Sequence, residues 1–129
     1  IPRLMRGPHA AEAVLCAGAI GGREGFVSLQ RHLYATQPDW RFLRDIGPFV
    51  RRAAAEAGLN PVDFDECISR DAMAPLIASD LRLGVSLGAS GTPTIVLMAP
   101  GASERSDLFS GTEPLSRYEE ALAHTTSPN

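Results

Sequence analysis

Two cysteines are the residues of this sequence with the most distinctive chemistry. Cys16 and Cys67 lie far apart in the chain, and neither belongs to a Cys-x-x-Cys pair. Thiol–disulfide exchange needs an activated thiolate, usually at a helix N-terminus, and a second cysteine that resolves the mixed disulfide. Both cysteines instead fall on apolar faces of predicted helices, where a thiol ionises less readily. We therefore expect no catalytic residue in this chain.

The histidines and carboxylates offer no second centre of reactivity. His9, His32 and His124 are dispersed, and none has a partner three or four residues away that could share a metal ion. We expect no metal site and no cofactor. His9 lies near a predicted helix start and is interpreted as a capping or packing residue, whereas Glu12 and Asp80 are interpreted as solvated or paired carboxylates on helices.

The segment from Gly91 to Met98 is the other candidate, because a Thr-Pro dipeptide opens there directly into an apolar run. Proline has no backbone N–H, so within a sheet it is confined to the start of a strand or to an edge. The apolar residues 95–98 predict a strand covered on both faces. A proline in front of such a strand is either an ordinary trans proline or one held in the cis form.

Helical periodicity dominates the chain before this segment. Glycine, proline or capping residues bound each apolar run. The predicted helices run from Pro8 to Gly21-Gly22, from Glu24 to Ala35, from Pro48 to Gly58, after the Asn60-Pro61 cap, and from an Asp71 cap to Gly88. Apolar positions on the last helix are Met73, Leu76, Ile77, Leu81, Leu83 and Leu87. Residues 37–39 are predicted to end the second helix, and residues 39–46 to form one or two helical turns.

The C-terminal part is predicted to return as a hairpin. Residues 107–110 pair as an antiparallel strand, and Pro114 starts a final helix with apolar residues on one face. Residues 1–6 are interpreted as the tail of a strand or a connection, and residues 125–129 as a loose tail.

Composition limits the chain to one domain and excludes some partners. The 129 residues are 44% hydrophobic, which is enough for a single core. The net charge of -3 provides no basic field for nucleic acid or an anionic membrane. No apolar run has the length needed to span a bilayer, and the N-terminal residues do not form a signal peptide.

In their order and spacing, these segments resemble the DsbA-like thiol–disulfide oxidoreductases of the thioredoxin superfamily. The matching segments are Gly7-Pro8-His9-Ala10, Leu15-Cys16-Ala17, Gly25-Phe26, Leu33-Tyr34 with Gln37, Ala57-Gly58-Leu59-Asn60, Phe64-Asp65-Glu66-Cys67 and Gly91-Thr92-Pro93-Thr94. The first has Gly where the family has His, Val27 replaces a Trp, and Gln30 falls where a His is common.

The resemblance implies an α/β, thioredoxin-like fold with an inserted helical bundle. This chain would be mostly helical, with a C-terminal β-hairpin and a final helix. Residues 1–129 would form a single, incomplete domain, with the helical insertion at 8–88 and the cis-proline loop, hairpin and last helix at 91–124. The first strand and the Cys-x-x-Cys helix would precede Ile1. A sheet reduced to one hairpin would expose its edge and one face, so we expect the missing half of the domain, a partner chain or an exchange between copies in a dimer to complete it.

The resemblance also implies a function, protein disulfide oxidation or isomerisation on protein or peptide substrates. Gly91, Thr92 and Pro93 would bind substrate, with the backbone N–H and C=O of Thr92 presented to an extended peptide. Some members of the family carry an extra bridge within the helical insertion. Cys16 and Cys67 are therefore either that bridge or two buried free thiols, and a bridge would favour an oxidising, extracytoplasmic compartment.

Two other classes of function share these features. Kappa-type glutathione transferases and 2-hydroxychromene-2-carboxylate isomerases have a helical insertion and a proline loop, and an upstream Ser replaces the catalytic Cys. A non-catalytic thioredoxin-fold binding module would lack the catalytic thiols. The segment preceding Ile1 distinguishes the three hypotheses.

Overall fold

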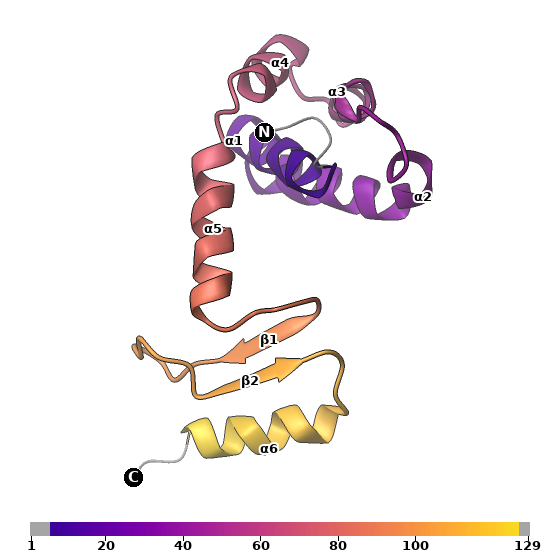
Figure 1. The fold of residues 1–129 in the computed structure, drawn as a ribbon. Coiled ribbons are helices and arrows are strands. Elements are labelled where there is room, and N and C mark those ends of the chain that lie inside the picture. Colours follow the sequence, from indigo (N-terminus) through magenta and orange to yellow (C-terminus); the bar gives the residue numbers. More distant parts are fainter. Residues whose placement is uncertain (1–5, 127–129) are drawn as a thin grey trace. The chain divides into compact units, whose positions relative to one another are not determined.

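The computed structural model describes residues 6–126, which form six helices and two strands (Figure 1). The elements are α1 (Arg6–Ala35), α2 (Gln37–Trp40), α3 (Gly47–Glu56), α4 (Pro61–Ser69), α5 (Ala74–Ser86), β1 (Thr94–Leu97), β2 (Asp107–Ser110) and α6 (Leu115–Thr126). The chain divides into two compact units, which we call the helical unit, up to Ala78, and the hairpin unit, from Ser79. The expected mostly helical chain with a hairpin and a last helix is confirmed.

Helix α1 consists of two arms joined at Gly22. This glycine has φ 64° and ψ -157°, which is outside the helical region and which L side chains rarely adopt. The predicted break at Gly21-Gly22 is therefore confirmed. The arms approach each other closely, because an added Cβ on Gly25 would lie 2.5 Å from the carbonyl oxygen of Ala17. A Cβ on Gly18 would lie 3.3 Å from the Cβ of Phe26.

We expect Gly25→Ala to destabilise the helical unit by about 1–3 kcal/mol, because the added methyl meets a backbone oxygen that cannot rotate away. Urea denaturation followed by the fluorescence of Trp40, the only tryptophan, measures this change. Gly7→Ala is the control, since a Cβ at Gly7 meets nothing within 4 Å. Equal stability of the two variants would contradict the close approach of the two arms.

The short helices α2, α3 and α4 each have a proline in the first two positions, and α4 also has a side-chain cap. The Asn60 side chain accepts hydrogen bonds from the backbone N–H groups of Val62 and Asp63, at 2.9 and 3.1 Å, so the predicted cap of α4 is confirmed. The segment Gln37-Pro38-Asp39 ends α1 as predicted, and it also begins the one-turn helix α2. The Trp40 side chain is buried, and its Nε1 donates to the Leu33 carbonyl at 2.8 Å.

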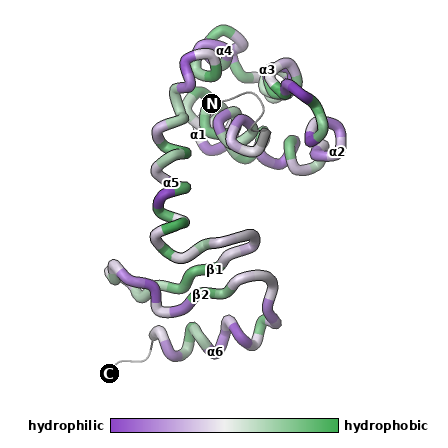
Figure 2. Tube along the Cα trace, in the orientation of Figure 1, coloured by the Kyte–Doolittle hydropathy of each residue, from purple (hydrophilic) through white to green (hydrophobic). Residues whose placement is uncertain are grey.

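The core of the helical unit lies where α1, α3 and α4 pack against one another. Figure 2 shows apolar residues recurring along these helices, as one-sided burial requires. The largest fully buried side chains are Phe64, Leu29, Ile46, Glu12, Val50 and Cys16. All are in the helical unit, so the main core of the described chain lies there.

Helix α5 begins later than predicted, and its apolar residues are not buried. It begins at Ala74, three residues after the expected Asp71 cap, and Asp71 itself has φ 49°. None of its residues is buried, and the side chains of Leu81 and Leu83 are 60% and 57% exposed. An apolar helix needs a second surface to cover it, and periodicity does not show whether that surface is present.

The hairpin unit contains a two-stranded antiparallel sheet in which Ile95 pairs with Phe109 and Val96 with Leu108. The second strand spans residues 107–110, as predicted. The prediction that residues 95–98 are covered on both faces is wrong, since Ile95 and Met98 are 37% and 40% exposed. Within residues 6–126, β1 has one strand neighbour and one helix, α6, against it, which is too little to cover it. The exposure expected of a two-stranded sheet is confirmed.

Both ends of the described chain are helical. Residues 1–5 and 127–129 lie outside the described residues. Arg6 belongs to α1 and not to a strand, and α6 continues through Thr126, where a loose tail was expected. The Thr125 hydroxyl donates to the Ala121 carbonyl at 2.9 Å within this last turn. None of the described helices is both long and apolar enough to cross a membrane.

Candidate functional site

The loop before β1 brings the three predicted binding residues together at the surface. Gly91, Thr92 and Pro93 are all exposed, and the Thr92–Pro93 peptide bond is cis. The Pro93 carbonyl accepts a hydrogen bond from the Gly111 N–H at 2.8 Å. The Thr94 hydroxyl donates to the Gly91 carbonyl. The loop is therefore held at its base by the end of β2 and by its own first strand residue.

The backbone of Thr92 is available for binding. Within residues 6–126, no hydrogen bond engages the N–H or the C=O of Thr92. It directly precedes Pro93 and β1, and the described chain leaves one edge of β1 unpaired. An exposed strand edge is a template for an extended peptide, which adds through main-chain hydrogen bonds. The arrangement can thus recognise backbone without any particular side chain.

The surroundings of this loop carry no charge in the sequence. From Leu83 to Ser103 there is no Asp, Glu, Lys, Arg or His. Ile95 and Met98, both partly exposed, supply apolar surface beside the loop. A peptide bound here could be held by backbone hydrogen bonds and apolar contacts.

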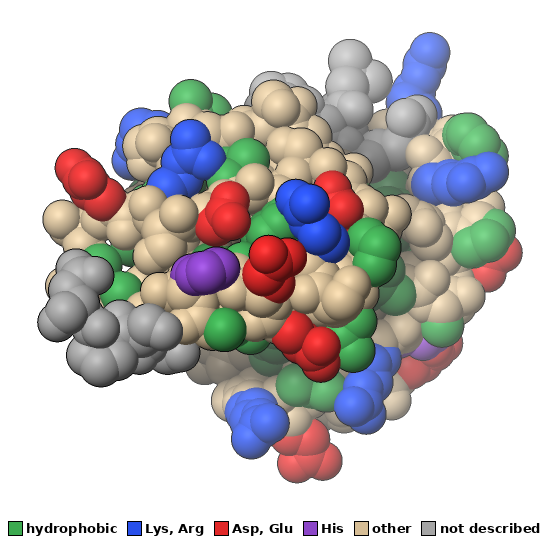
Figure 3. Space-filling view, turned by 90° about the horizontal axis from the view of Figure 1, so that it is seen from below, with side chains coloured by type: hydrophobic (Ala, Val, Ile, Leu, Met, Phe, Trp, Pro, Cys, Tyr) green, Lys and Arg blue, Asp and Glu red, His purple; other side chains and the backbone are tan. Residues whose placement is uncertain are grey.

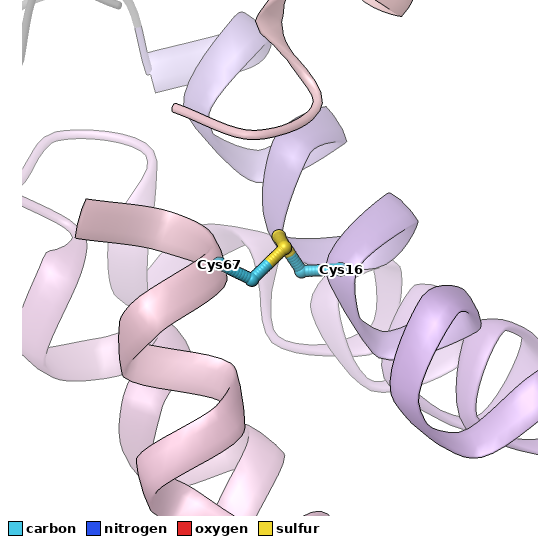
Figure 4. Close-up of a disulfide and its surroundings, with 2 residues drawn as sticks. All are labelled: Cys16 and Cys67. Atoms are coloured by element: carbon cyan, nitrogen blue, oxygen red, sulfur yellow. A yellow bond between two sulfur atoms is a disulfide. The ribbon is translucent and has the colours of Figure 1, made fainter. Parts of the chain in front are cut away.

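Cys16 and Cys67 form a disulfide between α1 and α4, as Figure 4 shows. Their Cα atoms are 6.0 Å apart, and the side chain of Cys16 is completely buried. The bridge is confirmed, and the alternative of two free thiols is wrong. Both cysteines of the chain are thereby used, so no thiol of this chain is free to attack a substrate disulfide.

A shallow pocket of about 190 Å³ lies between β2 and α6. Its lining residues are Asp107, Phe109, Arg117, Glu120, Ala121 and His124. The view from below in Figure 3 shows acidic and basic side chains interspersed, without a field of one sign. None of the three loop residues lines the pocket, so we treat it as separate from the loop.

Two polar residues of α1, His9 and Glu12, are buried, and of these only the packing of His9 was among the expectations. These residues are 8% and 1% exposed, and among the described residues both ring nitrogens of His9 and Oε1 of Glu12 have no hydrogen-bond partner. Burial lowers the pKa of His9, and the nearby Asp45 carboxylate opposes this shift. Burial, followed by the Asp71 carboxylate, raises the pKa of Glu12. The three-residue spacing, which places both on one helix face, was the available signal.

His9 was interpreted as a capping or a packing residue, and its burial agrees with packing. Glu12 is not solvated. We expect Glu12→Gln to stabilise the helical unit at neutral pH by on the order of 1 kcal/mol, because an ionised buried carboxylate is no longer required. A raised folded-state pKa means that stability is full below the unfolded value and is lost as pH rises through the folded value.

The stability gained by Glu12→Gln over the wild type should therefore decrease as the pH is lowered. Urea denaturation of the wild type and Glu12→Gln from pH 4 to 8, a range of about four units around the relevant pKa values, measures it. Glu56→Gln is the control, since Glu56 is exposed on α3. A difference in the free energy of unfolding between the wild type and Glu12→Gln that does not change with pH would contradict a raised pKa of Glu12.

In the part of the chain that the structure describes, no group of three or more His, Cys, Asp or Glu side chains is arranged to hold a metal ion. Comparison with known proteins finds no matching family model, no matching curated protein and no matching solved structure.

Proposed function

We propose that this chain is part of a DsbA-like thiol–disulfide oxidoreductase domain with a thioredoxin-like fold, in which it supplies the helical insertion and the loop that binds substrate. The observation that carries the proposal is the exposed loop Gly91–Pro93, where the backbone of Thr92 is unused and leads into the open edge of β1. The substrates are extended segments of proteins or peptides that carry thiols or disulfides.

The helical unit supports this proposal in its order and its covalent chemistry. The helices precede the proline loop, which is the order that the resemblance implies. The disulfide lies within the helical unit and joins α1 to α4. A structural disulfide fits an oxidising compartment, so we place the protein outside the cytoplasm. Since both cysteines are bonded, the proposal requires a catalytic Cys-x-x-Cys in a segment beyond this chain.

A second candidate function is a binding module without catalysis. It is favoured by the uncharged sequence around the loop, because residues 83–103 include no Asp, Glu, Lys, Arg or His that could act as a general base or acid. In that case strand addition at Thr92 is the whole activity. The two candidates share the loop and differ only in the thiols.

The sequence encoded upstream of Ile1 separates these candidates. We expect a Cys-x-x-Cys there, and the longer protein should catalyse reduction of insulin disulfides by dithiothreitol. A lone Ser at that position would support the glutathione transferase or isomerase class instead. Absence of both would leave the binding module.

Peptide binding tests the loop in the chain itself. We expect amide resonances of Gly91, Thr92 and Thr94 to shift when an uncharged extended peptide is titrated into labelled protein. The same peptide with N-methylated alternate residues should not bind, because strand addition needs its N–H groups. Thr92→Ala is the control that keeps the backbone and removes the side chain, and it should bind the unmodified peptide within about twofold. Equal binding of both peptides would contradict strand addition.

A further inference from the structure

An exposed aromatic and basic surface lies at the end of α1 and just after α2. The side chains of Tyr34 and Phe42 are 73% and 75% exposed, and Leu43 is 40% exposed. Arg41 and Arg44, on either side of Phe42 and Leu43, are exposed as well. We call these five residues the Arg-Phe patch. Exposure of large apolar side chains next to one another usually marks an interaction surface.

Hydrogen bonds fix the backbone of the segment that carries the patch. The buried Trp40 donates from Nε1 to the Leu33 carbonyl at 2.8 Å, which fixes the segment against the end of α1. The Arg41 N–H donates to the Gln37 carbonyl, and the Leu43 N–H to the Trp40 carbonyl, each at 3.0 Å. Because its base is ordered, the patch presents Phe42 at little entropic cost on binding.

The charges around the patch are basic. The Arg41 guanidinium carbon lies 4.4 Å from the centre of the Phe42 ring, so charge and ring project together. Arg31 lies one helical turn before Tyr34 on α1 and is exposed. From Arg31 to Asp45, the sequence has three arginines and two acids, Asp39 and Asp45, so this segment carries a net charge of +1.

The net charge of -3 does not oppose an anionic partner at this place. Up to Ala78, nine arginines balance nine acidic residues. From Ser79 onward, three arginines stand against six acidic residues, so the whole negative excess belongs to the hairpin unit. The global charge therefore conceals a locally basic surface, and field strength at a contact depends on charges within about 10 Å.

We propose that the Arg-Phe patch binds the surface of an anionic lipid bilayer. Phe42 and Leu43 enter the interfacial region, and Arg41 and Arg44 contact lipid phosphates, as basic residues flanking apolar ones do at membrane interfaces. Tyr34 takes the headgroup level, where aromatic rings with a polar group are favoured. The proposal is independent of the function of the proline loop.

Vesicle binding tests it. The wild type should co-sediment with vesicles of equal parts phosphatidylglycerol and phosphatidylcholine, and much less with phosphatidylcholine alone. Binding should weaken between about 0.01 M and about 1 M salt as the charges are screened. Phe42→Ser should lower the partition coefficient at least about tenfold, because the inserted ring is lost. Val62→Ser is the matched control, since Val62 is 73% exposed and followed by Asp63, and it should bind like the wild type.

A second pair of variants tests the charges. Arg41→Gln with Arg44→Gln should reduce binding to the anionic vesicles, whereas Arg52→Gln with Arg82→Gln, which changes the net charge equally, should not. Insertion is tested by Phe42→Trp, whose emission should shift to the blue on vesicles and be quenched by lipids with a nitroxide in the acyl chain. No binding of the wild type, or equal loss in both arginine pairs, would overturn the proposal, and a protein partner would then be the remaining occupant.

Discussion

Replacing Cys16 and Cys67 together by alanine is expected to lower the free energy of unfolding of the helical unit by about 4 kcal/mol. The bridge closes a loop spanning 51 residues, and in the chain-entropy model a loop of that length restricts the unfolded chain by this amount. Since small domains are stable by only about 5–15 kcal/mol, this is a large part of the total. Urea denaturation of unreduced protein, followed by Trp40 fluorescence, measures the loss.

Val62→Ala is the control on the same helix, because its side chain is 73% exposed and its loss should matter little. Wild-type protein in excess dithiothreitol should match the double variant once the bond is reduced. A thiol reagent applied under denaturing, non-reducing conditions should find no free thiol in the wild type. Two labelled thiols, or a double variant as stable as the wild type, would contradict the role of the bridge.

Features set by one residue and its neighbours were predictable from the sequence. Gly22 tolerates a positive φ, and the Asn60 side chain caps α4. Both effects involve only a few neighbouring residues. The strand at 107–110 and the proline loop likewise follow from local turn and proline chemistry. In these cases the signal and its structural effect lie in the same short segment, so the boundaries agree.

Burial that depends on distant segments was not predictable in the same way. Glu12 is buried beside Met73 and Asp71, which are far along the chain, whereas its helical position alone predicted a solvated or paired carboxylate. The apolar run of β1 predicts a covered strand, but covering needs neighbours that a two-stranded sheet does not provide. For the candidate site, the sequence indicated the loop residues. Whether the backbone of Thr92 is free of hydrogen bonds depends on the folded loop, which the sequence does not show.

The hairpin unit depends on a single aromatic side chain for its internal packing. Phe109 is 6% exposed and is the one buried residue between Ser79 and Thr125. Its ring packs edge to face against the ring of Tyr118, with the two ring centres 4.9 Å apart. We expect Phe109→Ala to remove about 3–5 kcal/mol from this unit, the usual cost of deleting a buried aromatic ring. A two-stranded hairpin is only marginally stable, so the unit should unfold locally.

Amide hydrogen exchange detects this unfolding residue by residue. In Phe109→Ala, the protected amides of β1 and β2 should exchange at the rate of an unfolded chain, whereas Trp40 fluorescence should still report an intact helical unit. Leu115→Ala is the control, because Leu115 is 71% exposed and should change neither signal. Since the end of β2 holds the loop through the Gly111 N–H and the Pro93 carbonyl, Phe109→Ala should also lose peptide binding at Thr92. Retained binding with an unprotected hairpin would show that the loop does not need the sheet.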